Sequence, residues 1–174
     1  TAFLLHPDGV LGADSSLLED DTATSFTADP ENPLPTIAGN VSSLTENLPV
    51  PGRSKMPDPI TMRRSIVFQG AADQVIRADL RCKPPFGPLA DRPDAIVFET
   101  AKLASPVEII GPVSVSLHVS CDAPDTDIFA MLLDIYPESP EWPDGYRLNI
   151  ADGIMRLRYR EGMDRPKLLI SGEI

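Results

Sequence analysis

Hydrophobic and polar residues alternate along one stretch of the chain, and the next stretch is almost uniformly apolar. In residues 113–120, VSVSLHVS, three valines and a leucine occupy every second position, and three serines and a histidine lie between them. This period of two predicts a half-buried strand. Residues 128–136, IFAMLLDIY, are apolar on both faces, so we expect a strand at the centre of a sheet with both sides covered.

Shorter apolar runs bounded by turn residues predict further strands. These runs cover residues 1–5, 65–69, 95–100, 146–150 and 154–160. Turns or loops are expected at HPDG (6–9), KPPFGP (83–88) and the Asp-Gly pairs 144–145 and 152–153. No amphipathic helix of useful length is visible, and the 19 prolines disfavour a helical protein. The pattern therefore predicts an all-β protein, an antiparallel β-sandwich or jelly roll.

The domain organisation follows from where the turn-rich and the strand-like segments lie. We place a first strand and an extended arm in residues 1–50, and the sandwich in residues 51–174 with an insertion near residues 75–92. Prolines at 30, 33 and 35 favour an extended backbone in the arm; a flexible linker is the alternative. A jelly roll needs about eight strands, more than the pattern supplies, so we expect a sandwich that is incomplete at the C-terminus, in a piece of a larger protein.

The charge of the chain excludes some partners. Its 174 residues carry a formal net charge of -11, so nothing could neutralise a row of phosphates, and neither nucleic acid nor an anionic membrane is expected as a partner. No apolar run approaches the roughly 18 residues of a membrane span. Cys82 and Cys121 lack metal-like spacing. Two reduced thiols, which favour the cytoplasm, are the simpler interpretation, and a disulfide stays open.

Three aspartates, Asp122, Asp125 and Asp127, crowd the turn between the two clearest strands. Several carboxylates close together could bind calcium, but the spacing is not that of an EF-hand loop and the turn holds no glycine. The alternative is a turn in which aspartate side chains accept hydrogen bonds from backbone N–H groups. The sequence favours the turn and leaves calcium as the weaker candidate.

Three arginines, Arg156, Arg158 and Arg160, alternate with Met155, Leu157 and Tyr159 in a predicted strand. On one strand face the arginines would lie about 7 Å apart and repel one another unless carboxylates or solvent separate them. We hypothesise a structural cluster in which arginines pair with the aspartate turn or with Asp134, with Tyr159 beside them. The alternative is an exposed, solvated face, in which each ion pair contributes little.

The residues that hydrolytic chemistry would need are missing. No G-x-S-x-G nucleophile elbow occurs, and neither histidine has a visible triad partner. We expect His6 in a solvent-facing turn and His118 on the exposed serine face of its strand. No His and Cys cluster indicates zinc, no opposed carboxylates indicate glycoside hydrolysis, and no cofactor is expected.

Three aromatic residues, Tyr136, Trp142 and Tyr146, lie in or beside one predicted loop. They could form a platform on which a sugar stacks, which makes a carbohydrate-binding module the alternative function. A place in the core or at an interface is favoured over the platform.

Several longer motifs occur in order along most of the chain. They are FTADPENPLPTIAG (26–39), GAADQ (70–74), DRPDAIVFET (91–100), the segment 109–137 and LNIADGIMRLRYRE (148–161). Together they resemble the C-terminal domain of the cocaine esterase and X-prolyl dipeptidyl-peptidase family of serine hydrolases. The resemblance is weakest over about residues 53–90, where the spacing departs from the family pattern.

The resemblance implies a jelly roll related to galactose-binding domains, accompanied in the same protein by an α/β-hydrolase catalytic domain with a Ser/Asp/His triad. No residue here matches the triad motifs, so no catalytic residue is carried over. The implied role is to pack on the catalytic domain and to help shape its substrate pocket, and a homo-oligomer stays open. The parent would hydrolyse an ester or amide by acyl transfer, and the resemblance leaves its substrate open.

Overall fold

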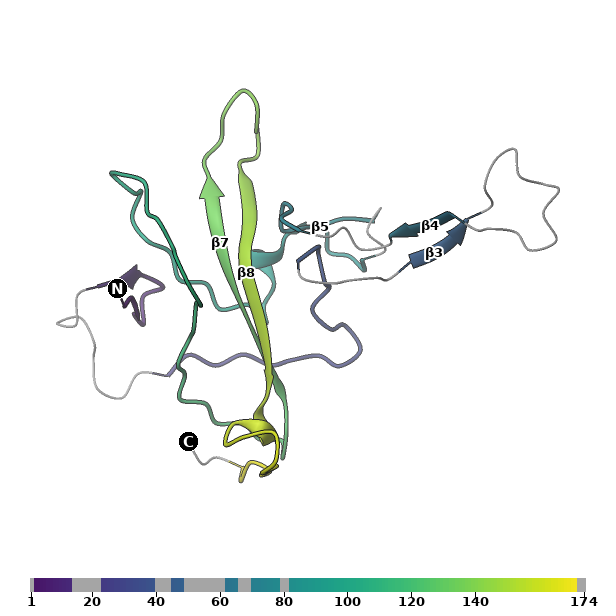
Figure 1. The fold of residues 1–174 in the computed structure, drawn as a ribbon, viewed down its shortest axis with the longest axis vertical. Helices are drawn as coiled ribbons and strands as arrows, with labels where there is room; N and C mark the ends of the chain where they lie inside the picture. The colour runs from purple at the N-terminus through teal and green to yellow at the C-terminus, as the bar shows by residue number, and fades with distance from the viewer. Residues whose placement is uncertain are drawn as a thin grey trace. The chain divides into compact units, whose positions relative to one another are not determined.

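The computed structural model describes residues 2–13, 23–39, 45–48, 62–65, 70–78 and 82–171, with only the backbone described for 45–48 and 62–65. Within these residues the chain forms antiparallel strand pairs and two single turns of 3-10 helix (Figure 1). The predicted all-β class is confirmed. No helix in the described part of the chain has the length and apolar character needed to cross a bilayer.

The described strands form four two-stranded sheets. The pairs are β1 (Leu4–Leu5) with β2 (Leu11–Gly12), β3 (Thr45–Leu48) with β4 (Met62–Ser65), β5 (Val75–Ile76) with β6 (Gly87–Pro88), and β7 (Asp127–Tyr136) with β8 (Tyr146–Arg156). The 3-10 turns are η3 (Leu89–Asp91) and η4 (Leu157–Tyr159). Of the strand predicted at 65–69, residues 66–69 lie outside the described residues.

The chain divides into two compact units. One comprises Thr1–Pro35 and Val75–Gly111, and the other comprises Thr36–Gln74 and Pro112–Ile174. The units are groups of residues that contact one another in space. This grouping does not test the proposed division into arm, sandwich and insertion, so that division stays a prediction. The units are described separately below.

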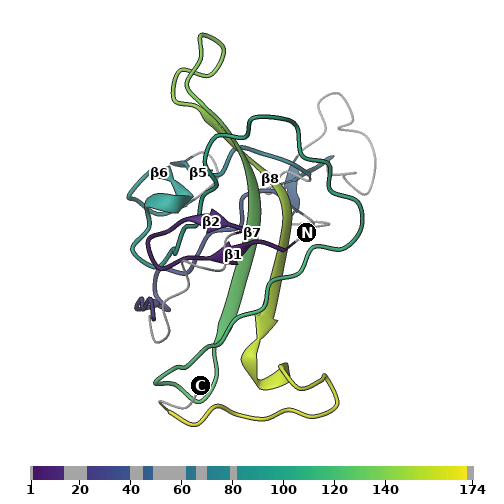
Figure 2. The ribbon, with the colours of Figure 1, turned by 90° about the vertical axis from the view of Figure 1, so that its left-hand side faces the viewer.

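The long β7–β8 hairpin is the main element of the second unit (Figure 2). Its strands pair in antiparallel register from Asp127 opposite Arg156 to Tyr136 opposite Tyr146. The predicted loop with Asp144-Gly145 connects them, and Gly145 has a φ of 70°, a left-handed conformation that glycine adopts without steric cost. The hairpin forms because a long apolar run is followed by a turn and a second β-prone run.

Two predictions about the second strand of this hairpin are wrong. Asp152-Gly153 is not a turn, because the ladder continues through it: Asp152 lies opposite Met131 and Gly153 opposite Ala130. The register of the ladder shifts once, at a bulge between the pairs made by Leu132 and Leu133. It also ends at Arg156 and turns into η4, so the three arginines do not share one strand face.

The strand predicted over 113–120 is absent as well. Across residues 100–120 the main chain makes no hydrogen bond to any described residue, and Val113, Val115 and Leu117 are 52%, 52% and 45% exposed. An alternating sequence forms a strand only where a neighbouring strand accepts hydrogen bonds from its N–H groups and donates them to its C=O groups. Among the described residues β7 likewise pairs with β8 alone, so it is not the covered central strand that we predicted.

In the first unit, the HPDG turn joins β1 to β2 as predicted, with Gly9 at a φ of 84°. The run predicted as a strand over 95–100 forms instead a single parallel bridge between Val10 and Glu99. Part of the Pro-rich arm is held here, because Arg92 donates to the Asn32 carbonyl oxygen at 2.7 Å. The same arginine forks onto Asp94 at 2.6 and 2.7 Å, and this hydrogen bonding lowers the pKa of that carboxyl.

A buried polar node in the second unit ties the GAADQ motif to β8. Gln74 is fully buried, and its Nε2 donates to the carbonyl oxygens of Ile37 at 2.9 Å and Ala72 at 3.1 Å. Asn149 Oδ1 accepts from the Ala72 N–H at 2.7 Å. The end of the arm, the motif and β8 are therefore joined by side-chain amides together with backbone bonds, such as that from the Gln74 N–H to the Arg147 carbonyl oxygen at 3.0 Å.

Candidate functional site

The aspartate turn meets the end of β8 and the start of η4, and two ion pairs form there. Asp127 and Arg156 lie opposite each other in the ladder, and the guanidinium donates from Nε and Nη2 to the two carboxylate oxygens, both at 2.9 Å. This is the two-bond geometry that a planar guanidinium offers to a carboxylate. The hydrogen bonds lower the pKa of Asp127 below its ordinary value.

Asp125 is more buried than Asp127 and lies near both arginines. Its Oδ1 accepts from the Arg158 backbone N–H at 2.9 Å, and its Oδ2 accepts from Arg158 Nε at 2.6 Å. The Asp125 side chain is 12% exposed and that of Arg158 is 38% exposed. Partial desolvation raises the pKa of Asp125, but the hydrogen bonds from Arg158 and the charges of both arginines outweigh it, so the pKa lies below its ordinary value.

The remaining members of the predicted structural set lie outside these pairs. Asp122 is exposed, and its carboxylate contacts the thiol of Cys121 at 3.8 Å. Tyr159 closes η4, where its carbonyl oxygen accepts from the Gly162 N–H. Arg160 donates to the carbonyl oxygens of Leu157 and Lys167 rather than to a carboxylate. The local reason is η4, which turns successive side chains away from a common face.

The structure brings together two of the three carboxylates named as a weak calcium candidate. Asp125 and Asp127 are engaged by arginines, and Asp122 lies apart from them. No group of three or more His, Cys, Asp or Glu side chains among the described residues could hold a metal ion. The chemistry of this site is that of ion pairs.

The prediction for His6 is wrong, because this residue is only 1% exposed. Neither of its ring nitrogens has a hydrogen-bond partner among the described residues. The His6 N–H donates to the Val10 carbonyl oxygen, and its own carbonyl oxygen accepts from the Gly9 N–H; the ring lies beside Gly12. His118 is exposed, as predicted. Cys82 and Cys121 form no disulfide.

The three aromatic residues meet at the tip of the β7–β8 hairpin. The rings of Trp142 and Tyr146 contact each other with centroids 4.4 Å apart and planes at 50°, and Tyr136 meets Tyr146 edge-on at 6.4 Å and 75°. Tyr136 and Trp142 remain 44% and 40% exposed. Hydrogen bonding to Asp134 raises the pKa of the Tyr136 phenol.

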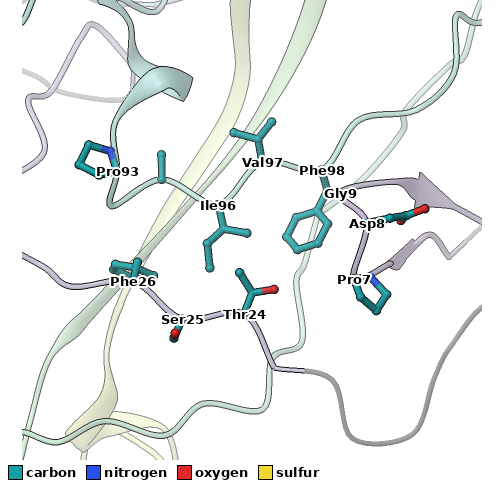
Figure 3. A pocket seen from close by; sticks show the side chains of 11 residues that line it. Pro7, Asp8, Gly9, Thr24, Ser25, Phe26, Pro93, Ile96, Val97 and Phe98 are labelled. Atoms are coloured by element: carbon teal, nitrogen blue, oxygen red, sulfur yellow. The ribbon is translucent and has the colours of Figure 1, made fainter.

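A shallow cleft of about 310 Å³ lies in the first unit (Figure 3). Its walls include Phe26, Ile96 and Phe98, with polar groups from Asp8, Thr24 and Ser25. It contains no histidine, cysteine or lysine that could activate a nucleophile or act as a base.

Sequence reasoning missed two residues that the fold depends on. Gln74 and Asn149 are buried and bonded to backbone groups far along the chain. Both lie in the motifs that carried the family resemblance, GAADQ and LNIADGIMRLRYRE. A buried polar role cannot be read from local pattern alone, because amides are usually found at the surface.

Comparison with known proteins identifies the family of the chain. Residues 12–174 match the family described as the X-Pro dipeptidyl-peptidase C-terminal non-catalytic domain. The chain is also 44% identical over 87 residues to a cocaine esterase of Rhodococcus sp. (strain MB1 Bresler). That alignment covers 50% of this chain but only 14% of the esterase, and no solved structure matches. The chain therefore belongs to the family of X-Pro dipeptidyl-peptidase C-terminal non-catalytic domains.

Proposed function

We propose that the chain is the scaffold domain of a serine hydrolase, and that it packs on an α/β-hydrolase catalytic domain of the same protein. In this role it completes a jelly-roll sandwich with other segments of that protein and helps to shape the wall of the substrate pocket. The parent enzyme cleaves an ester or amide by serine attack, with a histidine base and an oxyanion hole supplied by the catalytic domain.

One observation carries the proposal: apolar side chains are exposed where a sheet neighbour would cover them. Val113, Val115 and Leu117 alternate along an extended segment that lacks main-chain hydrogen bonds to the described residues. On the β7–β8 hairpin, Phe129, Ile154 and Met155 are exposed as well. Large apolar side chains that remain exposed are candidates for an interaction face, and unpaired strand edges add a row of hydrogen-bonding groups that an adjoining strand satisfies.

The ion pairs fit the same role. Asp125 and Asp127 fix the entry to β7 against the exit from β8, so the two strands keep their register where the hairpin leaves the turn. Their contribution is structural, since both carboxylates are occupied by arginines.

The carbohydrate-binding alternative is less well supported. Trp142 and Tyr146 are tilted by 50°, and Tyr136 and Tyr146 by 75°, so the three rings do not form one flat platform.

The assignment can be tested by active-site labelling of the parent protein. A fluorophosphonate reacts with the activated serine of a serine hydrolase, and digestion followed by mass spectrometry locates the labelled peptide. The label is expected on a serine outside this chain, and the isolated chain is expected to stay unlabelled and to leave p-nitrophenyl acetate intact. Labelling of a serine within residues 1–174, abolished by heat denaturation, would contradict a non-catalytic role.

A further inference from the structure

We propose that the tip of the β7–β8 hairpin is a docking site for an arginine side chain on a basic polypeptide partner. The tip consists of an aromatic cluster, Tyr136, Trp142 and Tyr146, and of the loop 137–145 between the strands. Nothing in the family description assigns a partner to this loop.

The three rings of the aromatic cluster contact one another, and two of them stay accessible. Each ring supports the next, through the Trp142–Tyr146 contact at 4.4 Å and the edge-on Tyr136–Tyr146 contact at 6.4 Å. Tyr136 and Trp142 nevertheless keep close to half of their surface exposed. Tryptophan and tyrosine faces attract cations, and an arginine guanidinium can also stack on them.

The loop itself is fixed by its own backbone. The Ser139 N–H donates to the Trp142 carbonyl oxygen at 2.9 Å, and the Trp142 N–H donates to the carbonyl and hydroxyl oxygens of Ser139 at 3.1 and 3.0 Å. The Gly145 N–H also donates to the Trp142 carbonyl oxygen, at 3.0 Å. Prolines 137, 140 and 143 restrict the remaining backbone. A site that is already ordered loses little conformational entropy when a partner binds.

The charge around the cluster identifies the partner as cationic. Between residues 134 and 146 the sequence places four acids and no lysine or arginine, the acids being Asp134, Glu138, Glu141 and Asp144. The three in the loop are exposed. They spread along the loop, which matches a polypeptide with several basic groups better than a single small cation. Carboxylates beside an aromatic face complement an arginine, because its guanidinium can donate two hydrogen bonds to a carboxylate and can stack on an aromatic ring.

Fluorescence gives a direct test, because Trp142 is the only tryptophan of the chain. The full chain is titrated with acetyl-GRGRGR-amide, with the same peptide carrying citrulline in place of arginine, and with free arginine. Citrulline keeps the shape of arginine and removes its charge. We expect a saturable change in Trp142 emission with the arginine peptide and about tenfold weaker affinity for the citrulline peptide. The affinity for the arginine peptide should fall in 0.5 M salt. Free arginine should change the emission little.

Charge variants locate the binding within the chain. The double variant Glu138→Gln/Glu141→Gln keeps the aromatic cluster and is expected to weaken binding of the arginine peptide at least about fivefold. The double variant Glu108→Gln/Asp164→Asn removes two exposed acids from other parts of the chain and is expected to bind as the native chain does. Three results would each overturn the proposal. One is equal affinity for the arginine and citrulline peptides, and another is an equal loss of affinity for the arginine peptide in both double variants. The third is a saturable response to neutral oligosaccharides with none to the arginine peptide.

Discussion

At the scale of single residues, Asp125 is the most buried acid of the turn and lies near both arginines. One oxygen accepts from the Arg158 backbone and the other from its guanidinium, and little of the side chain is exposed. Asp127 instead forms a two-bonded pair at a more exposed position. Because exposed ion pairs contribute little to stability, Asp125–Arg158 is the pair from which a measurable contribution is expected.

Replacing Arg158 with methionine keeps the length of the side chain and removes its charge. Asp125 then keeps its bond from the backbone and loses the nearer of its two counter-ions, with Arg156 Nε still 4.0 Å from Oδ2, so we expect the thermal midpoint to fall by a few degrees in differential scanning fluorimetry. Arg165→Met serves as the control, since Arg165 is largely exposed and lies 3.6 Å from an equally exposed Asp164. Equal midpoints for the Arg158 variant and the native chain would show that the pair does not stabilise the fold.

The pH dependence of this pair has a definite sign. The pKa of Asp125 in the fold lies below its ordinary value of 3.8, so its charged form stabilises the folded state above that pH. The contribution is lost as the pH falls from 3.8 through the lower pKa of the fold. In thermal melts from pH 7 to pH 2, the deficit of Asp125→Asn relative to the native chain should therefore shrink only below about pH 4. A deficit that is constant down to pH 2 would exclude this electrostatic origin.

At the scale of elements, the β7–β8 hairpin depends on one backbone position. Gly145 has a φ of 70°, and a Cβ added there would lie 2.8 Å from the Tyr136 carbonyl oxygen. The turn, the aromatic cluster and the start of β8 all follow from this conformation. Gly153 is in the same strand, but a Cβ there would meet nothing within 4 Å.

These two glycines form a matched pair for mutation. Gly145→Ala should reduce the free energy of unfolding in urea by about 1–2 kcal/mol, because alanine is strained in the left-handed region and also meets the carbonyl oxygen. Gly153→Ala should leave it almost unchanged. A larger loss at Gly153 than at Gly145 would contradict the described turn.

At the scale of the whole molecule, the sequence predicted the elements that depend on residues close together along the chain. The all-β class, the HPDG turn, the Asp144-Gly145 loop and the strand of IFAMLLDIY follow from nearest neighbours and period, and the structure has them. Charge alone suggested that some of the arginines pair with the aspartate turn or with Asp134, but not which ones, and it left a solvated face open; the structure pairs Arg158 with Asp125 and Arg156 with Asp127. The role of the pair in stability stays a prediction.

The failures are positions where contacts distant in sequence decide. The segment 113–120 has a strand pattern but no neighbour among the described residues, so it remains unpaired. His6 is buried by the hairpin that its own backbone closes. Gln74 and Asn149 join segments more than 30 residues apart along the chain, and no local pattern reports such a bond.

The central claim is that this chain is a scaffold domain whose extended segment 113–120 is covered by other parts of its parent protein. Hydrogen exchange measured by mass spectrometry tests it at residues 113–119, in the isolated chain and in the parent. We predict that these amides exchange in the isolated chain as in an unstructured peptide, and at least about 100-fold more slowly in the parent. Rapid exchange in both proteins, or strong protection in the isolated chain, would contradict the account.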